Sequence, residues 1–160
     1  MAGLLDGRVA VITGGTRGLG YAIAEAYAAE GAAVVVASRS PGAVARAAER
    51  LRSAGRRASG FGCDVSDAAQ VRALADHARA AFGGLDIWVN NAGIAGPYGP
   101  TLGTPAERFM QVVQTNIVGT YNGSRTAMQH FVAQGRGKLI NLVGRGDRKP
   151  TPLQNAYAPS

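Results

Sequence analysis

The sequence has one cysteine and no long apolar segment. Because Cys63 has no second cysteine to pair with, no internal disulfide can form, and we expect a reducing compartment, the cytoplasm. No run approaches the roughly 18 uncharged apolar residues that a membrane span needs. Residues 1–6 lack the basic and apolar regions of a signal peptide. We therefore expect a cytoplasmic protein without a membrane partner.

Acidic and aromatic residues are also scarce, and the chain is basic. It has 17 lysines and arginines against 10 acidic residues, a net charge of +7, and aromatic residues make up only 6%. An excess of positive charge is typical of proteins that bind nucleic acid. Here, however, the arginines are scattered through alanine-rich segments, and the clusters at 56–57 and 145–149 are short. No aromatic residues alternate with them to stack on bases, so we expect no nucleic-acid partner.

Short apolar runs alternate with longer alanine-rich segments along the chain. The apolar, β-branched runs predict strands at 8–13, 33–38, 57–63, 86–89 and 138–143. Apolar residues at helical spacing predict helices over 19–31, 41–55, 67–82 and 104–133. Strands that are apolar throughout and alternate with helices indicate a parallel sheet covered on both faces. Residues 1–160 contain no linker or repeat and are predicted to form a single α/β domain.

Three local patterns predict how the helices begin and which way they face. Ser40 is expected to cap the second helix, with Pro41 at its first position. The segment Thr104-Pro105-Ala106-Glu107 predicts a capping box at the start of the last helix. Apolar residues at 19, 23, 26 and 27 predict the buried face of the first helix.

A glycine-rich turn separates the first predicted strand from the first predicted helix. It is Thr13-Gly14-Gly15-Thr16-Arg17-Gly18-Leu19-Gly20. Glycines at this place allow a tight turn, and the N–H groups at the helix N-terminus bind pyrophosphate. The turn predicts a dinucleotide-binding domain in which the cofactor contacts Gly14, Thr16, Arg17, Gly18, Leu19 and Gly20.

The end of the second predicted strand indicates which dinucleotide binds. An NAD site usually has Asp or Glu there to bind the ribose 2′-hydroxyl, whereas this chain has Ser38, Arg39 and Ser40. No carboxylate repels a 2′-phosphate, and Arg39 can pair with it, as can Arg17 from the turn. We therefore predict that NADP is the cofactor. In the alternative interpretation, both arginines are ordinary solvated side chains.

Four further motifs follow the glycine-rich turn. They are Asp64-Val65, Asn90-Asn91-Ala92-Gly93, Asn116 and Tyr157-Ala158-Pro159-Ser160. In order and spacing, these motifs and the Thr-Gly-x-x-x-Gly-x-Gly turn resemble the short-chain dehydrogenase/reductase family over the whole chain. The resemblance implies a Rossmann-type, doubly wound parallel sheet with strand order 3-2-1-4-5 and helices on both faces. It also implies that the cofactor contacts Asp64, Val65, Asn91, Ala92, Gly93 and Tyr157.

The resemblance further implies a reaction. In the family, a tyrosine at the position of Tyr157 exchanges a proton with the substrate oxygen while hydride moves to or from the nicotinamide. An asparagine at the position of Asn116 supports a proton-relay water. Together with the predicted NADP site, the resemblance implies an NADP(H)-dependent oxidoreductase that interconverts a small-molecule ketone and a secondary alcohol. No metal is expected. It is expected to form a dimer or tetramer.

The chain departs from the family pattern at two places. About 13 residues before the tyrosine, where the family has a serine that orients the substrate, this chain has Gly144. The family's lysine would follow Ser160, where the sequence ends. We therefore expect a C-terminally incomplete domain that binds nucleotide but is itself inactive. Gly144 also favours an alternative, a catalytically weak NADP-binding sensor or scaffold protein.

Each site residue also has an ordinary structural interpretation. Asn116 could cap or bend a helix by bonding to the backbone, Tyr157 could begin an amphipathic helix, and Asp64 could stabilise a turn. The family interpretation is preferred because the motifs occur together and in order.

Overall fold

Five parallel strands form one sheet in the computed structural model, which describes residues 3–144 and Tyr157. The strands are β1 (Val9–Thr13), β2 (Ala33–Ser38), β3 (Ala58–Gly62), β4 (Ile87–Asn90) and β5 (Lys138–Asn141), in the order β3-β2-β1-β4-β5. This confirms the predicted α/β fold and strand order. The basic cluster at 145–149 and residues 158–160 of the tyrosine motif lie outside the described residues.

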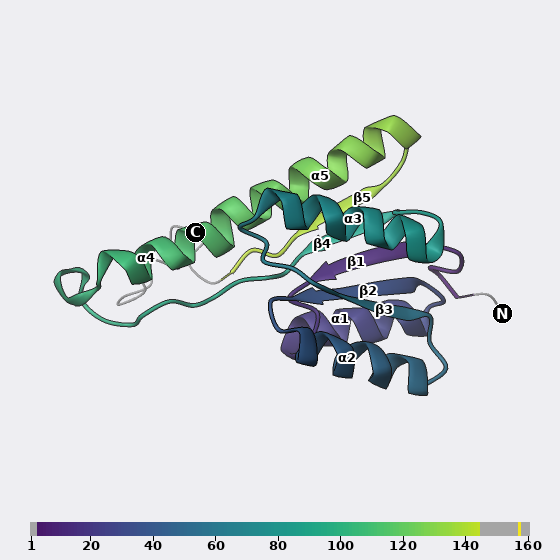
Figure 1. Ribbon diagram of the computed structural model, residues 1–160, viewed down its shortest axis with the longest axis horizontal. Helices are drawn as coiled ribbons and strands as arrows, with labels where there is room; N and C mark the ends of the chain where they lie inside the picture. Colours follow the sequence, from purple (N-terminus) through teal and green to yellow (C-terminus); the bar gives the residue numbers. More distant parts are fainter. Residues whose placement is uncertain (1–2, 145–156, 158–160) are drawn as a thin grey trace.

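Helices cover both faces of the sheet (Figure 1). Helices α1 (Gly18–Ala29) and α2 (Pro41–Ser53) lie on one face, and α3 (Ala68–Phe82) and α5 (Gly119–Gln134) lie on the other. Alternate residues of β1 point to the two faces, so Ala10 and Ile12 belong to one hydrophobic core and Val9 and Val11 to the other. The second of these cores also contains Trp88 of β4, which is fully buried. No helix in the described part of the chain is long and apolar enough to span a membrane.

The start of α2 follows the sequence prediction. Ser40 accepts a hydrogen bond from the backbone N–H of Ala43 at 3.3 Å, and Pro41 is the first helical residue. Helix α3 begins in the same way, because the Asp67 carboxylate accepts from the N–H of Ala69 at 2.8 Å. Hydrogen bonds from Gln70, above all from its side chain, lower the pKa of Asp67. The cap therefore stays ionised over a wider pH range than a free aspartate.

The predicted capping box at residues 104–107 is wrong. Helix α4 (Ala106–Val112) has Pro105 at its N-cap, without a side-chain cap hydrogen bond. The hydroxyl of Thr104 instead donates to the carbonyl of Pro100 at 3.4 Å, in the short 3₁₀ turn Thr101–Gly103. The helix begins one residue later than the box requires, so the N-cap position falls on Pro105, whose side chain has no hydrogen-bond acceptor.

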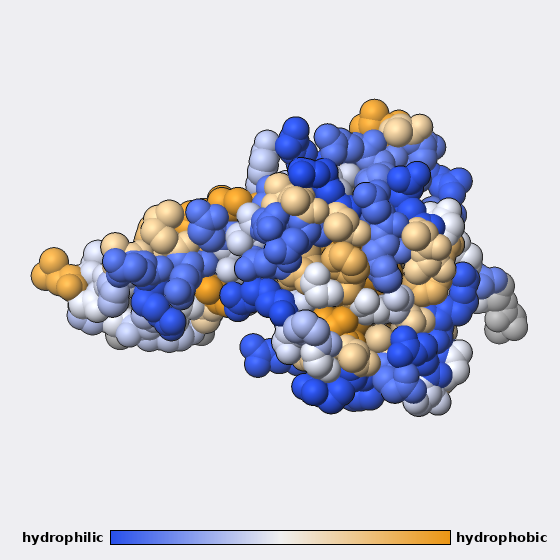
Figure 2. Space-filling model, in the orientation of Figure 1, coloured by the Kyte–Doolittle hydropathy of each residue, from blue (hydrophilic) through white to orange (hydrophobic). Residues whose placement is uncertain are grey.

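The last predicted helix is also not a single α-helix. A π-helical segment, η2 (Val113–Val118), joins α4 to α5. The α4 end of this continuous helical segment projects beyond the sheet (Figures 1 and 2). Apolar side chains are exposed in the 3₁₀ turn before α4, in α4 and in η2, including Leu102, Met110 and Ile117. π-Segments of this kind often mark functional sites, and this one contains Asn116.

The predicted buried face of α1 is only partly correct. Its buried residues are Gly20, Tyr21, Ala24 and Ala28. Of the four predicted residues, Ile23 and Tyr27 are partly buried, Ala26 is exposed and Leu19 is 60% exposed. The physical reason is the close packing of Gly20, where a Cβ atom would overlap the carbonyl oxygen of Gly14. This contact orients Gly20 inward, so that the adjacent Leu19 lies on the open side of the turn.

Candidate functional site

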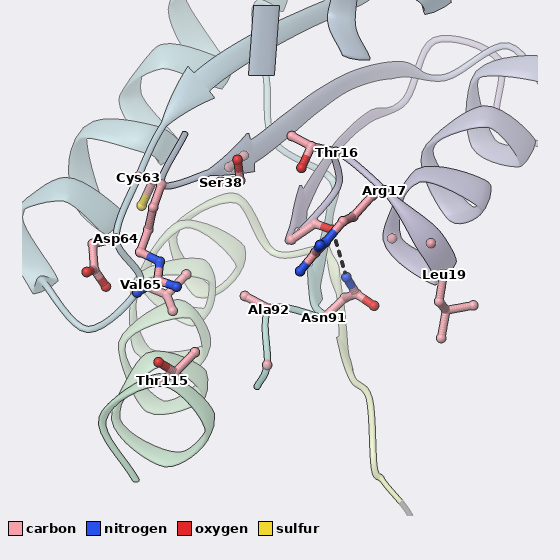
Figure 3. Close-up of a pocket in the computed structure, with 16 residues that line it drawn as sticks. Thr16, Arg17, Leu19, Ser38, Cys63, Asp64, Val65, Asn91, Ala92 and Thr115 are labelled. Atoms are coloured by element: carbon pink, nitrogen blue, oxygen red, sulfur yellow. Dashed lines mark hydrogen bonds between the residues drawn. The ribbon is translucent and has the colours of Figure 1, made fainter. Parts of the chain in front are cut away.

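A cleft opens at the carboxyl ends of the strands, the usual position of a ligand in an open parallel sheet. It is lined by Gly14, Thr16, Arg17, Gly18, Leu19, Gly20, Ala37, Ser38, Arg39, Cys63, Asp64, Val65, Asn91, Ala92, Gly93 and Thr115. Figure 3 shows Thr16, Arg17 and Leu19 on one side and Asp64, Val65 and Thr115 on the other, with Ala92 between. Most of the residues predicted to contact the cofactor therefore lie around one cleft. Ser40 and Tyr157 are not among the residues that line it.

The glycine-rich turn is held against the segment that follows β4. The buried hydroxyl of Thr13 donates to the carbonyl of Val89 at 3.2 Å. The same hydroxyl accepts from the N–H groups of Asn91 and Ala92, each at 3.1 Å. In return, the side-chain amide of Asn91 donates to the carbonyls of Thr13 and Gly14 at 2.9 and 3.2 Å. These bonds fix the turn before any ligand arrives.

The glycines of the turn leave room for an anionic group. Gly14 and Gly18 have positive φ values of 64° and 53°, which non-glycine residues adopt only with strain. A Cβ atom on Gly20 would overlap both Gly14 and the Asn91 side chain. The first N–H groups of α1 have no acceptor within the helix and carry its positive dipole end. The site therefore fits a pyrophosphate.

Two arginines flank the cleft beside the end of β2. Arg39 follows β2 directly, and Arg17 occupies the N-cap position of α1. Among residues 3–144 and Tyr157, neither guanidinium forms an ion pair with a carboxylate. Both are therefore available to an anionic ligand. Ser40 caps α2 instead of lining the cleft.

The turn after β3 forms the opposite wall of the cleft. Asp64 stabilises this turn, because its carboxylate accepts from the N–H and the hydroxyl of Ser66 at 2.9 and 2.7 Å. Its own N–H donates to the side chain of Gln70 at 2.9 Å. Asp64 thus has the structural role that its sequence context permits, and it also lines the cleft.

Three cleft residues were not predicted from the sequence: Ala37, Cys63 and Thr115. Ala37 and Cys63 lie at or just beyond strand ends, a position that could have indicated them. Thr115 comes from η2, and no pattern in the sequence indicated it.

The thiol of Cys63 lies at the cleft but is not reactive. Burial, followed by the nearby carboxylates of Asp64 and Asp67, raises the pKa of the Cys63 thiol to about 12, so this thiol is neutral and a poor nucleophile. In the described ranges, no group of three or more His, Cys, Asp or Glu residues is arranged to hold a metal.

Asn116 is bonded to the chain segment that follows β4. Its side-chain oxygen accepts from the N–H of Ile94 at 2.9 Å, and its amide nitrogen donates to the Ile94 carbonyl at 3.1 Å. The side chain therefore holds the backbone just beyond Gly93 by a pair of bonds. Its predicted catalytic role remains a prediction, and it does not line the cleft.

Gly144 and Tyr157 lie in contact. A Cβ atom on Gly144 would overlap the phenol oxygen of Tyr157. The tyrosine hydroxyl thus occupies the space that a side chain at position 144 would need. The structure therefore brings together two of the three predicted catalytic residues, Gly144 and Tyr157. They can approach this closely because Gly144 has no side chain.

Comparisons with known proteins extend these observations. Residues 8–160 match the family model described as short chain dehydrogenase. The 4-formylbenzenesulfonate dehydrogenase of Comamonas testosteroni is 39% identical over 156 residues, which are 98% of this chain and 62% of that protein. The chain therefore spans about three fifths of the length of this relative.

Solved structures agree in fold and in the part that is covered. A gluconate 5-dehydrogenase from Burkholderia cenocepacia, in complex with NADP and tartrate, is 36% identical with a TM-score of 0.90, and the match covers 97% of this chain and 60% of that one. An NAD⁺-bound xylitol dehydrogenase is 27% identical with a TM-score of 0.93, over 98% of this chain and 60% of that one. With the parallel sheet, the glycine-rich cleft and the family match in agreement, the chain belongs to the short-chain dehydrogenase family.

Proposed function

We propose that the protein is an NADP(H)-dependent oxidoreductase that interconverts a ketone and a secondary alcohol, and that residues 1–160 supply its dinucleotide site. The observation that carries the cofactor assignment is Arg39, which lines the cleft and directly follows β2. Neither β2 nor the residues directly after it contain an Asp or Glu. The gluconate 5-dehydrogenase contains NADP and the xylitol dehydrogenase NAD⁺, so similarity alone does not select between them. The charge at the end of β2 supports NADP.

The residues have distinct tasks in this proposal. The N–H groups at the start of α1 bind the pyrophosphate, and Arg39 and Arg17 bind the 2′-phosphate. Bound NADPH supplies the hydride. The hydroxyl of Tyr157 donates a proton to the substrate oxygen during reduction and takes it back during oxidation. Asn116 holds the backbone at Ile94 beside the cleft.

Arg39→Asp tests the cofactor assignment. The substitution removes a cation and places a carboxylate where the 2′-phosphate binds, so the Kd for NADPH is expected to rise about 30-fold. The Kd for NADH is expected to stay equal or fall. Both constants can be measured by the fluorescence of the reduced nicotinamide. Arg46→Asp is the matched control, because Arg46 is exposed on α2 outside the cleft and changes the net charge equally.

Equal NADPH affinity in the wild type and in Arg39→Asp would contradict the assignment to NADP. An equal loss in Arg46→Asp would show that the effect comes from net charge and not from the site.

A catalytically weak sensor is the second candidate, and Gly144 is the observation that favours it. Turnover of NADPH by the full-length protein against a panel of ketones separates the two functions. Oxidation of NADPH with at least one ketone supports the enzyme. Tight NADPH binding without turnover of any ketone supports the sensor.

Gly144→Ser tests whether the glycine impairs the site or belongs to it. Because the Tyr157 hydroxyl occupies the space of a side chain at 144, serine is expected to displace it and lower kcat on the order of tenfold. The Kd for NADPH is expected to stay unchanged, since Gly144 does not line the cleft. Gly144→Ala is the control for the hydroxyl group. It adds the same Cβ atom, so it is also expected to displace the Tyr157 hydroxyl and to lower kcat. A kcat for Gly144→Ser above that of the wild type would contradict the expectation.

A further inference from the structure

The turn after β3, at Asp64, Val65 and Ser66, is held by hydrogen bonds to nearby residues and to residues distant in the sequence. Locally, Asp64 bonds to Ser66 and Gln70, which belong to the same turn and to the first turn of α3. These bonds fix the internal shape of the turn. They do not fix its position relative to the α5 side of the molecule, because every partner belongs to the same stretch of chain.

Asn122 of α5 forms side-chain hydrogen bonds that join the helix to this turn. Its amide nitrogen donates to the carbonyls of Val65 and Ser66 at 3.0 and 3.2 Å, across 57 and 56 residues of sequence. Asn122 is only 8% exposed, so its bond to Val65 is shielded from water and its bond to Ser66 is partly shielded. Neither Asn122 nor its position was singled out from the sequence.

The backbone of α5 also packs closely against the same turn. At Gly119, one turn before Asn122, a Cβ atom would overlap the side chain of Val65. Gly119 and Asn122 lie three residues apart and therefore share one face of the helix. A close steric contact and a pair of hydrogen bonds thus hold the same wall of the cleft.

We infer that Asn122 is a positioning residue for the wall of the cleft formed by Asp64 and Val65, where the adenosine half of the dinucleotide binds. This inference rests on the proposed function for the identity of the ligand. Without the Asn122 amide, two carbonyls lose a donor in a shielded place, and the turn must shift to find other partners. Asn116 of η2 similarly holds the backbone at Ile94, just beyond the cleft residues Asn91, Ala92 and Gly93.

Asn122→Leu tests this role in the full-length protein. The substitution keeps a side chain of similar size and removes the donor. The Kd values for NADPH and for 5′-AMP are expected to rise about tenfold, measured by calorimetry. The Kd for nicotinamide mononucleotide is expected to stay unchanged, because that half does not contact the turn at Asp64 and Val65.

Gln134→Leu is the matched control. Gln134 lies on the same helix, and its amide also donates to two backbone carbonyls, those of Leu85 and Arg136, at 2.8 and 2.7 Å. Neither acceptor is among the residues that line the cleft. Its loss is expected to lower Tm and to leave all three Kd values unchanged, which separates positioning of the turn from general stability.

The outcomes distinguish the inference from the function on which it rests. If wild-type protein binds NADPH and 5′-AMP, and Asn122→Leu binds 5′-AMP as the wild type does, the inference is wrong. An equal loss of affinity for 5′-AMP and nicotinamide mononucleotide would also overturn it. If the wild type binds neither NADPH nor 5′-AMP, the proposed function fails and the inference fails with it. Asn122→Ser, which keeps one hydroxyl donor, is expected to show a smaller loss and provides the test should the leucine variant not fold.

Discussion

Replacement of Tyr157 by phenylalanine is expected to lower kcat for ketone reduction by about 1000-fold while the Kd for NADPH changes by less than about twofold. The substitution removes one oxygen, which is the atom proposed to transfer the proton. Tyr157 does not line the nucleotide cleft, so loss of its hydroxyl leaves the pyrophosphate and 2′-phosphate contacts in place. A large fall in kcat at constant Kd is therefore the expected signature of a proton donor.

Tyr121→Phe controls for the loss of a phenol elsewhere. Tyr121 is 62% exposed on α5 and does not line the cleft, so its kinetics are expected to equal those of the wild type. Steady-state rates and fluorescence titration supply both constants for each variant. Wild-type turnover in Tyr157→Phe would remove the tyrosine from the mechanism.

The second large effect is expected from Gly20→Ala. The new methyl group would overlap the Gly14 carbonyl and the Asn91 side chain, and overpacking of this kind costs about 1–3 kcal/mol. To relieve both overlaps, the Gly14 backbone and the Asn91 side chain must move away from the start of α1, which changes the shape of the pyrophosphate site. We therefore expect the Kd for NADPH to rise by about 100-fold and Tm to fall.

Gly42→Ala is the matched control for this substitution. Gly42 also lies in the first turn of a helix, but a methyl group there meets only the tip of the Arg46 side chain, at 3.4 Å. Alanine is the better helix former, so this variant is expected to keep its NADPH affinity and to gain a little stability. If Gly20→Ala behaves as Gly42→Ala does, the close packing at Gly20 has no role in binding.

The sheet was predictable because each of its signals is local. The central strands β1 and β2 are apolar at all but their last position, and the predicted strand 33–38 agrees with β2 residue for residue. The cap at Ser40 follows from a hydroxyl next to a proline at the first helical position. The strand order, in contrast, came only through the family resemblance.

Two predictions about the last helix were wrong: the capping box at its start and its continuity as a single α-helix. Thr104 has the right residue type for a capping box, but α4 begins one position later, with Pro105 at its N-cap. The π-segment η2 has no specific sequence signature, because Asn116 and the β-branched residues around it indicate only a weaker or bent helix. Its presence could be learned only from the folded chain.

Much of the site was predictable as a set of residues but not as an arrangement. The glycine-rich turn indicates a nucleotide, yet the mutual bonds between Thr13 and Asn91 join positions 78 residues apart. The bond of Asn122 to Val65, in the turn after β3, joins positions 57 residues apart. Contacts of this kind depend on how the helices pack on the sheet, which no single segment encodes.

The position of Trp88 allows its fluorescence to report both nucleotide binding and unfolding. It is the only tryptophan of the chain, it is fully buried in β4, and its indole N–H donates to Asn90 at 2.8 Å. Asn90 directly precedes Asn91 at the edge of the cleft. Reduced nicotinamides absorb at wavelengths at which indole emits, so energy transfer from this single residue reports binding without an added label. A shift of its emission to longer wavelength on exposure to water reports unfolding of the sheet.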